Sequence, residues 1–233
     1  LSALSDASSV VKLSFYDTDI SDAGLSYLAN MTGLRALGLS KTKTSDAGLS
    51  HLKGLSALEA LFLSETKISD AGLSHLKGLS ALKSLILYKT KVTDAGLQHL
   101  AGLKNLSILN LTATKVGDLG IAHLSGLTEM LELFLGDTRV TDAALLTIQG
   151  FKKLQLLYVW DTKVRNDGLV LLRGLSDLKE LAIGSTKISD AGLIHLSGLK
   201  KLSTLHTCYN KVTKKGKAAL KASLPNLTIE KCN

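Results

Sequence analysis

The sequence predicts an α/β solenoid, in which short strands form one parallel sheet and short helices cover the face behind it. An aspartate, or a residue in its place, recurs every 24 residues from Asp22 to Lys214 without insertion or deletion. Counted from that aspartate as position 1, leucines or similar residues occupy positions 4, 7, 10, 13, 16 and 18, and Ile or Val usually fills position 23. This period and the spacing L-x-x-L-x-L are typical of a right-handed leucine-rich repeat solenoid, or horseshoe, with a concave parallel sheet and short convex helices.

The repeat pattern divides the chain into three parts. Residues 1–21 form a partial N-terminal repeat, residues 22–213 form eight repeats of 24 residues, and residues 214–233 form a C-terminal capping repeat. Hydrophobic residues make up 45% of the chain but aromatic residues only 4%, as expected for a core of stacked leucines. No apolar run approaches the ~18 residues of a membrane-spanning helix, so we expect no membrane insertion.

The N-terminal end follows the repeat register from the partial repeat onward. Leu13, Phe15, Thr18 and Ile20 occupy positions 16, 18, 21 and 23, but no sequence typical of a cap precedes them. An uncapped solenoid exposes a layer of core side chains. We therefore expect further repeats or a cap upstream in a longer protein, or an association through this end. The chain carries no targeting segment, which leaves its compartment open.

The first half of each repeat predicts a short helix that runs from position 24 of the preceding unit to position 9. Leucines at positions 4, 7 and 10 lie on one helical face. A Ser or Thr at position 24, or the aspartate after it, is predicted to supply the oxygen that caps the helix N-terminus. Glycine at position 9, such as Gly54, is predicted to end the helix. Glycine at position 3 is predicted to let neighbouring units approach closely, although Ala144 takes this place once.

The second half of each repeat changes to the alternation of a strand. Positions 16 and 18 are predicted to point toward the core, and positions 15, 17 and 19 to point outward. Stacking of the repeats then builds a parallel sheet with about 4.8 Å between strands. The sequence predicts a last strand over residues 227–229 and nine strands centred near Ser14, Gly38, Phe62, Ile86, Asn110, Phe134, Tyr158, Ala182 and His206.

The positive charge is concentrated at the C-terminal end. The chain has a formal net charge of +8, and residues 200–233, with eight lysines and Glu230, contribute +7 of it. The preceding repeats are nearly neutral, which argues against nucleic-acid binding along the body. The lysine-rich segment before Pro225 suits a polar cap, and it leaves polyanion binding at this end as an alternative. Cys208 and Cys232 lie near the same end, either as a disulfide or as two thiols.

Three ladders of similar residues run along the repeats. Threonines at position 21, such as Thr66, are expected to turn inward and bond to backbone groups. Lysines at position 22, such as Lys67, are expected to pair with the aspartates three residues later. Histidines at position 6 are expected to be solvated, because ligands spread along a solenoid do not converge on a metal. No catalytic set stands out, so we expect no enzyme activity and neither a metal nor a cofactor site.

The strand half varies where the helix half does not. Residues 45–58 and 69–82 are identical over 14 positions, but the next ten residues differ in size, charge and aromaticity at outward positions. Seven of the ten aromatic residues occupy positions 17, 19 or 20. Exposed aromatic residues on a rigid sheet are typical of binding surfaces, although shielding of the sheet is an alternative explanation. The candidate ligand-binding residues of the concave face are Tyr16, Phe62, Tyr88, Glu132, Phe134, Asp137, Tyr158, Trp160, Asp161 and Tyr209.

The densest part of this surface predicts a binding site for a protein or peptide. Its aromatic anchor consists of Phe134, Tyr158 and Trp160, and an acidic rim around it would select basic residues of the ligand. The rim consists of Glu132, Asp137, Asp161 and Glu180, with Lys179 as the nearest opposing charge. The alternative function is a structural or adhesion array whose contacts are spread along the repeats.

The residues also resemble a known family. The D-A-G-L units and the ending A-A-L-K-A-S-L-P-N-L-T-I are similar to the bacterial leucine-rich repeats of the T-D-x-G-L type, which are common in planctomycete proteins. The units are also similar to GALA-type effectors and to the ribonuclease-inhibitor-like superfamily more broadly. The resemblance covers nearly the whole chain and implies a protein-interaction module without naming a ligand.

Overall fold

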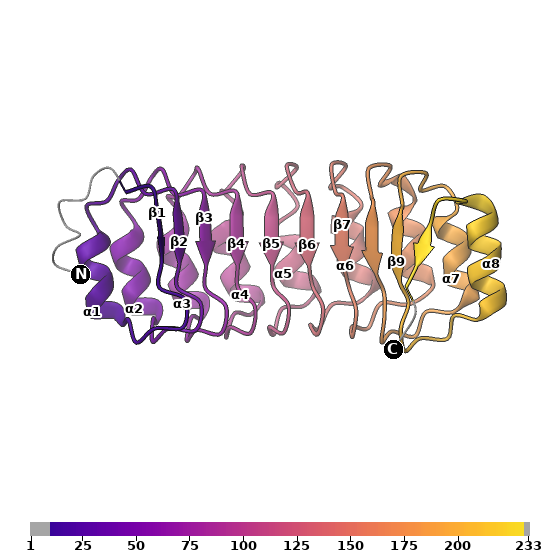
Figure 1. Ribbon diagram of the computed structural model, residues 1–233, viewed down its shortest axis with the longest axis horizontal. Coiled ribbons are helices and arrows are strands. Elements are labelled where there is room, and N and C mark those ends of the chain that lie inside the picture. The colour runs from indigo at the N-terminus through magenta and orange to yellow at the C-terminus, as the bar shows by residue number, and fades with distance from the viewer. Residues whose placement is uncertain (1–9, 231–233) are drawn as a thin grey trace.

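The computed structural model describes residues 10–230, in which ten short strands form one parallel sheet in chain order (Figure 1). The sheet is one layer, and the helices form a second layer behind it along the length of the molecule (Figure 1). The strands are β1 (Lys12–Ser14), β2 (Ala36–Gly38), β3 (Ala60–Phe62), β4 (Ser84–Ile86), β5 (Ile108–Asn110), β6 (Glu132–Phe134), β7 (Leu156–Tyr158), β8 (Glu180–Ala182), β9 (Thr204–His206) and β10 (Thr228–Ile229). The predicted α/β solenoid is confirmed.

The strands pair with an offset of one repeat. Leu61 lies beside Leu85, for example, and Phe62 lies beside Ile86. The first nine strands are centred one residue earlier than predicted, because a turn begins soon after position 17.

The helices are shorter and more varied than predicted. Most repeats combine one α-helical turn with a 3₁₀ turn, but one repeat is purely 3₁₀ and the last helix is the longest. They are α1 (Asp22–Leu25) with η2 (Ser26–Leu28), α2 (Asp46–Leu49) with η3 (Ser50–Leu52), α3 (Asp70–Leu73) with η4 (Ser74–Leu76), α4 (Asp94–Leu97) with η5 (Gln98–Leu100), α5 (Asp118–Ala122), α6 (Asp142–Ile148), η6 (Asp167–Gly174), α7 (Asp190–Leu193) with η7 (Ile194–Leu196), and α8 (Lys214–Ser223).

The core is a continuous stack of the predicted leucine positions. In the repeat that begins at Asp46, all seven of these side chains are fully buried. Burial of each leucine stabilises the fold by about 1.5–3 kcal/mol relative to an exposed side chain. Toward the N-terminus, Leu13, Phe15 and Ile20 are only partly buried.

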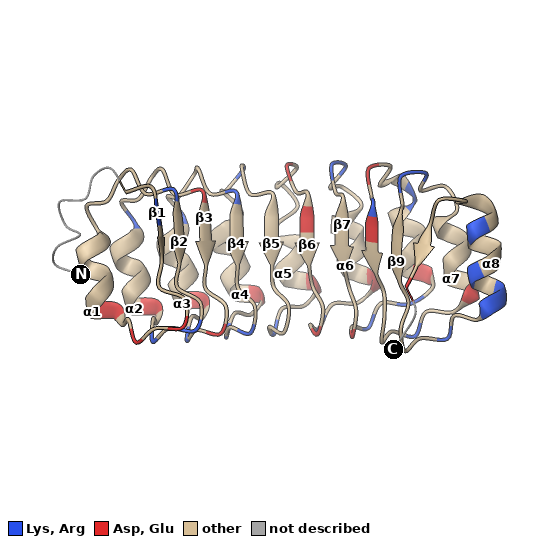
Figure 2. Cartoon of the chain, in the orientation of Figure 1, with Lys and Arg blue, Asp and Glu red and all other residues tan. Residues whose placement is uncertain are grey.

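The predicted helix caps are largely wrong. In most repeats the hydroxyl at position 24 makes no cap and instead bonds to the aspartate at position 1 of the same repeat, where the previous helix begins. Ser69 donates its N–H to Oδ1 of Asp46 at 2.7 Å and its hydroxyl to Oδ2 at 2.5 Å. Among the described helices, a side-chain cap forms at α6, where Thr141 accepts from Ala143, and at α8, where Thr213 accepts from Gly216. The aspartates therefore link the starts of successive helices. Figure 2 shows acidic residues, in red, at the starts of α1 to α4.

The two recurring glycine positions of the repeat have different roles, one between repeats and one where the helical segment ends. Glycine at position 3 does permit close approach, because a Cβ on Gly96 would lie 2.5 Å from Oδ1 of Asp70. The helical segments end at or just before the glycine at position 9, as η6 does at Gly174, but no described glycine has a positive φ, so none of them is a left-handed cap. The left-handed residues are instead nine non-glycine residues at position 20, with φ between 50° and 59°: Asp17, Lys41, Glu65, Lys89, Ala113, Asp137, Asp161, Ser185 and Tyr209.

The threonine ladder follows its prediction, but the lysine ladder does not. Thr66 is buried and donates its hydroxyl to the carbonyl of Leu63 at 2.6 Å, and the equivalent threonines do the same. Among the described residues, no position-22 lysine forms a salt bridge with the aspartate three residues later; Lys43 pairs with Asp19 instead. The aspartates are already engaged by the residue at position 24, just before the next helix.

No helix in residues 10–230 has the length and apolar character needed to cross a bilayer. The division into parts 1–21, 22–213 and 214–233 stays a prediction, as does association through the N-terminal end. Residues 1–9 lie outside the described part of the chain, and so does Cys232, for which the sequence leaves open a disulfide with Cys208 or two separate thiols.

Candidate functional site

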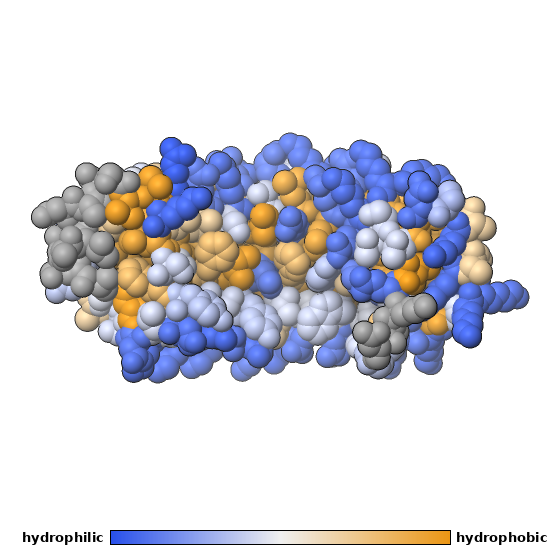
Figure 3. All heavy atoms as spheres, in the orientation of Figure 1, coloured by the Kyte–Doolittle hydropathy of each residue, from blue (hydrophilic) through white to orange (hydrophobic). Residues whose placement is uncertain are grey.

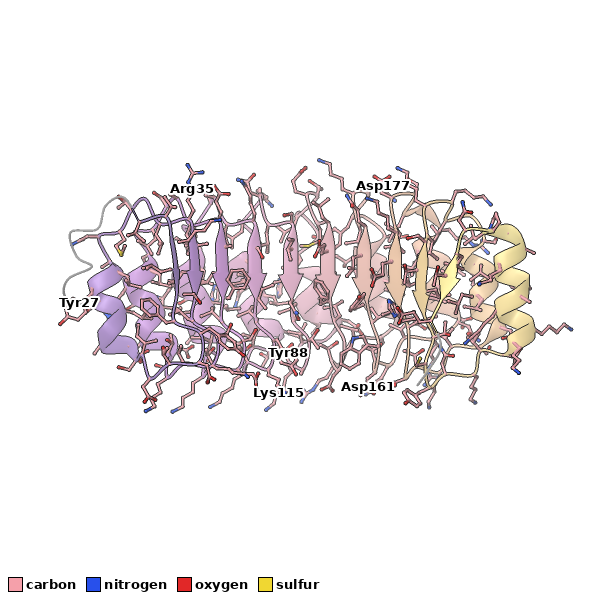
Figure 4. The ribbon with its side chains drawn as sticks, in the orientation of Figure 1. Tyr27, Arg35, Tyr88, Lys115, Asp161 and Asp177 are labelled. Atoms are coloured by element: carbon pink, nitrogen blue, oxygen red, sulfur yellow. The ribbon has the colours of Figure 1, made fainter. Side chains whose placement is uncertain are left out.

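The open face is the side of the sheet that the helices leave uncovered, and it corresponds to the predicted concave face. Apolar residues gather along the middle of this face, and hydrophilic residues line both of its edges (Figure 3). Arg35 and Asp177 lie at the edge where the strands begin, whereas Tyr88 and Asp161 lie at the edge where the strands end (Figure 4). The predicted site residues divide into two groups on this face.

The N-terminal group combines aromatic rings with lysines. Tyr16 and Phe62 line a hollow of about 520 Å³ that also contacts Lys12. Nζ of Lys41 lies 5.4 Å from the centroid of the Tyr16 ring. Interaction with the Tyr16 side chain raises the pKa of Lys41 above its ordinary value.

Tyr88, which follows β4, repeats this arrangement of a tyrosine beside a lysine. Nζ of Lys89 lies 5.1 Å from the centroid of its ring, and this contact raises the pKa of Lys89. Glu65 lies between the two lysines, 4.0 Å from Lys41 and 3.9 Å from Lys89. The N-terminal group is therefore positively charged and internally paired.

The C-terminal group is the predicted aromatic anchor, in which the rings of Phe134 and Tyr158 meet and Trp160 packs on Gly136. The rings of Phe134 on β6 and Tyr158 on β7 meet edge to face, with centroids 5.1 Å apart and an interplanar angle of 79°. Trp160 lies over Gly136 so closely that a Cβ on this glycine would overlap the indole ring. Tyr158 also contacts the ring of His206 on β9, with centroids 5.8 Å apart. The three strands thus share one continuous aromatic cluster.

A chain of hydrogen bonds supports this cluster from the side where the strands begin. Oη of Tyr158 donates to Oε1 of Glu180. The same oxygen lies 3.0 Å from Nε2 of His206, and Nδ1 of His206 lies 2.8 Å from Oε2 of Glu230. Four side chains on or beside four successive strands therefore hold one another in place.

The same contacts shift the pKa values of Tyr158 and Glu180. Burial, followed by the hydrogen bond to Glu180, raises the pKa of Tyr158 well above its ordinary value. The hydrogen bond from Tyr158 and the contact with His206 lower the pKa of Glu180, although burial opposes them. Near neutral pH, Tyr158 is therefore a hydroxyl donor and Glu180 a carboxylate acceptor.

The predicted acidic rim differs from the prediction in one residue. Glu180 is part of the hydrogen-bonded chain, whereas Asp137 and Asp161 are exposed on left-handed turns. Within residues 10–230, neither aspartate nor Glu132 takes part in a salt bridge. Lys179, the nearest predicted cation, donates instead to Oε1 of Gln155 at 2.9 Å. Three carboxylates thus remain available to a ligand.

A pocket of about 330 Å³ opens between β7 and β9, above β8. Its walls are aromatic, and its floor consists of the small residues of β8 and the turn after it. Tyr209 is 77% exposed at its edge. The lining residues are Tyr158, Trp160, Ala182, Gly184, Ser185, His206, Cys208 and Tyr209.

The sequence predicts the aromatic residues of the C-terminal group as candidates but does not predict two of their polar neighbours. His206 and Glu230 were not among the candidates, yet both complete the hydrogen-bonded chain. The repeat register contained this signal, because Tyr158 pairs with Ala182, and Ala182 pairs with His206. The small side chain of Ala182 lets the two flanking rings touch across it.

The convex side carries a feature that sequence reasoning also missed. At position 5, the hydroxyls of Ser26, Ser50 and Ser74 donate hydrogen bonds to the backbone carbonyl three residues earlier. In three later repeats this position is an exposed apolar residue on neighbouring helices. These residues are Leu146, Val170 and Ile194, which are 60%, 39% and 67% exposed.

The histidine ladder is less solvated than predicted. His51, His75, His99 and His195 are partly buried, and within the described residues Nδ1 of His99 has no hydrogen-bond partner. Burial lowers the pKa of His75 and His99 below the ordinary value. No group of three or more His, Cys, Asp or Glu side chains in residues 10–230 has a geometry that could hold a metal ion.

The structure is similar to solved leucine-rich repeat structures along most of its length. Internalin C2 from Listeria monocytogenes has 29% sequence identity and a TM-score of 0.72, over 91% of this chain and 84% of that chain. A leucine-rich repeat protein of Leptospira interrogans has 18% identity and a TM-score of 0.72, over 99% of this chain and 62% of that chain. A chain of the octameric complex of latrophilin 3, Unc5D and the FLRT2 leucine-rich repeat has 19% identity and a TM-score of 0.66, over 94% of this chain and 74% of that chain.

No family model matches the chain, and no curated protein matches it. The likenesses below 25% identity support the fold alone, and internalin C2 adds a bacterial neighbour with greater identity. The repeat spacing, the single parallel sheet in chain order and these neighbours agree. The chain is, by its fold, a leucine-rich repeat protein.

Proposed function

We propose that this chain is a recognition module that binds another protein or a peptide through the open face. The observation that carries the proposal is the aromatic cluster of Phe134, Tyr158 and Trp160 beside carboxylates that have no cationic partner among the described residues. Rigid aromatic anchors with a polar rim are typical of residues that dominate interface energetics. The ligand is expected to present basic residues to Asp137 and Asp161.

Two further considerations support this proposal. Leucine-rich repeat folds are typically binding modules rather than enzymes. One of the structural neighbours comes from a complex of FLRT2 with latrophilin 3 and Unc5D, which is an assembly of proteins. The finer assignment to the T-D-x-G-L type of bacterial repeats remains part of the proposal and rests on the D-A-G-L units.

Pull-down with the immobilised chain tests the proposal when matched variants are compared. The test variant replaces Phe134, Tyr158 and Trp160 by alanine, and the control variant replaces Tyr16, Phe62 and Tyr88. Neither set includes a fully buried core residue, so both variants should remain folded. A partner that the control retains and the test variant loses supports the proposal, whereas retention by the test variant contradicts it.

The exposed row of Leu146, Val170 and Ile194 favours a second candidate, a structural or adhesion array. Its contacts would lie on the convex side and would spread over successive repeats. Sedimentation velocity distinguishes this candidate, because it predicts concentration-dependent association that a triple serine variant of the row abolishes. A monomer at every concentration tested would argue against it.

A further inference from the structure

We infer that the pocket between β7 and β9 receives an arginine side chain of the bound partner. The inference rests on the proposed function, since it names the group that the open face would take at one place. It goes beyond the aromatic anchor because it assigns a defined pocket, its walls and the chemistry of its occupant.

The shape of the pocket suits a flat group. Its walls stand on β7 and β9, two strand spacings or about 9.6 Å apart at the backbone. Gly184 on its floor cannot gain a side chain without strain, because a Cβ there would lie 2.9 Å from the carbonyl oxygen of Cys208. A planar group stacked between two aromatic faces needs about 7 Å. The backbone spacing therefore leaves room for such a group above the small lining residues Ala182, Gly184 and Ser185.

The walls offer aromatic surfaces to a cation. Trp160 and Tyr158 come from the β7 side, and His206 and Tyr209 come from the β9 side. The contact between the Tyr158 and His206 rings closes the end of the pocket nearest the strand starts. The faces of Trp and Tyr attract a guanidinium or ammonium group, with Trp as the strongest partner.

Carboxylates lie beside the closed end of the pocket, where Glu180 contacts Tyr158. Glu180 and Glu230 both contact His206, so this group of three side chains is negative even when the imidazole is protonated. The charges of Glu180, Glu230 and Glu132 all raise the pKa of the Tyr158 hydroxyl at the closed end. Asp161, which directly follows Trp160, forms no salt bridge within the described residues. A cation is thus favoured over a neutral or acidic group.

The combination of walls and charge favours arginine over lysine. A guanidinium is planar, stacks on aromatic faces and donates several hydrogen bonds in one plane. An ammonium is compact and strongly hydrated, so it gains less from a flat slot. A neutral planar group would stack, but it would not gain from the carboxylates around the pocket.

The chain contains its own reporter for this pocket, because Trp160 is the only tryptophan in the sequence. Fluorescence of the intact chain can therefore be titrated with the probe N-acetyl-arginine amide. Its citrulline analogue has the same shape without the charge, and its lysine analogue tests the planar geometry. We expect a saturable change with the arginine probe at a millimolar dissociation constant and at least about 5-fold weaker binding of both analogues.

Two single variants link the signal to the pocket. Tyr209→Ala removes an exposed wall of the pocket and should weaken binding of the arginine probe about 10-fold. Asp161→Asn should weaken its binding about 3-fold. The matched control is Tyr16→Ala, which removes an exposed tyrosine at the other end of the sheet and should change nothing. Both tested side chains are exposed, so their replacement leaves the core intact.

The outcomes separate this inference from the proposed function. Failure of the arginine probe to bind, or equal binding of citrulline or lysine, overturns the arginine pocket even when a partner depends on the aromatic cluster. Arginine binding that Tyr209→Ala leaves unchanged also overturns it. The arginine pocket is supported when the probes and the variants together show the predicted order of affinities. If a captured partner then binds the triple alanine variant as well as the unaltered chain, that result contradicts the proposed function alone.

Discussion

Asp70, at the start of α3, binds Thr93, the residue just before α4, through two hydrogen bonds, one from the backbone N–H to Oδ1 at 2.7 Å and one from the hydroxyl to Oδ2 at 2.6 Å. Thr93 directly precedes α4, so each such aspartate positions the start of the next helix. Asn166 replaces the aspartate once and still bonds to Ser189, accepting from its N–H and donating to its hydroxyl. The contact between repeats is therefore polar, directional and local.

The first prediction follows from this contact. Asp70→Ala should lower the free energy of unfolding by about 2–3 kcal/mol, because two hydrogen bonds to a carboxylate are lost. Asp94→Ala should cost about half as much, because Gly117 offers Asp94 only its N–H, at 2.6 Å. Urea unfolding of the two variants provides the comparison. Equal losses would show that the hydroxyl bond contributes nothing to the link between repeats.

The second prediction concerns the left-handed turns. Ala113 has a φ of 57°, where an L-residue with a Cβ is strained by about 1–2 kcal/mol relative to glycine. Ala113→Gly should therefore raise the free energy of unfolding by about 0.5–1 kcal/mol, after the greater freedom of the unfolded chain is subtracted. Ala218→Gly is the control in the exposed interior of α8, and it should lower stability by about 1 kcal/mol. Loss of stability in both variants would contradict the strain argument.

The third prediction concerns two buried threonines. Within the described residues, the hydroxyl of Thr207 is buried without a hydrogen-bond partner, whereas that of Thr186 donates to the carbonyl of Ile183 at 2.6 Å. Thr207→Val should raise the free energy of unfolding by about 1 kcal/mol, and Thr186→Val should lower it by about 1 kcal/mol. Thermal unfolding of both variants checks the opposite signs. A loss at residue 207 would mean that its hydroxyl does find a partner in solution.

The fourth prediction is a dependence of stability on pH. Burial holds the pKa of His75 and His99 below the ordinary value of 6.5. At a pH just below 6.5, these two side chains therefore bind more protons in the unfolded chain than in the folded chain. Stability from these residues is thus fully present above the unfolded pKa and falls as the pH drops below it. Unfolding midpoints should decrease between about pH 7.5 and about pH 5.5.

The carboxylates give a control for this effect. Hydrogen bonds lower the pKa of Glu180 and Asp190 from ordinary values of 4.5 and 3.8, so their stabilising contribution is lost only at more acidic pH. A variant with His75→Gln and His99→Gln should therefore show a flatter dependence near pH 6 while keeping the acid loss. An unchanged slope near pH 6 in that variant would assign the effect to other groups.

The repeat period made the fold predictable, because each 24-residue step imposes the same register on every strand. Leu61 and Leu85 could be placed side by side, and Thr66 could be turned inward, from spacing alone. The caps were not predictable in this way. A hydroxyl before a helix normally caps it, and the competing acceptor, an aspartate 23 residues earlier, becomes visible only when the repeats are stacked.

The aromatic residues of the candidate site were predictable from the sequence, but the hydrogen bonds and ring contacts between its side chains were not. Phe134, Tyr158 and Trp160 stand at outward positions, and the register brings the strands that carry them together. Which side chains touch depends on rotamers and on small neighbours such as Ala182. For this reason Glu180 was assigned to the rim, and His206 was left out of the site, although both lie within hydrogen-bonding distance of each other.

Hydroxyl-radical footprinting of the chain with its captured partner tests the central claim most directly, because it reports on aromatic and aliphatic side chains of both faces at once. The account predicts that the partner protects Trp160, Tyr209 and Phe134 on the open face and leaves Leu146 and Ile194 as reactive as in the free chain. Protection of Leu146 and Ile194, with Trp160 and Tyr209 unchanged, would contradict it.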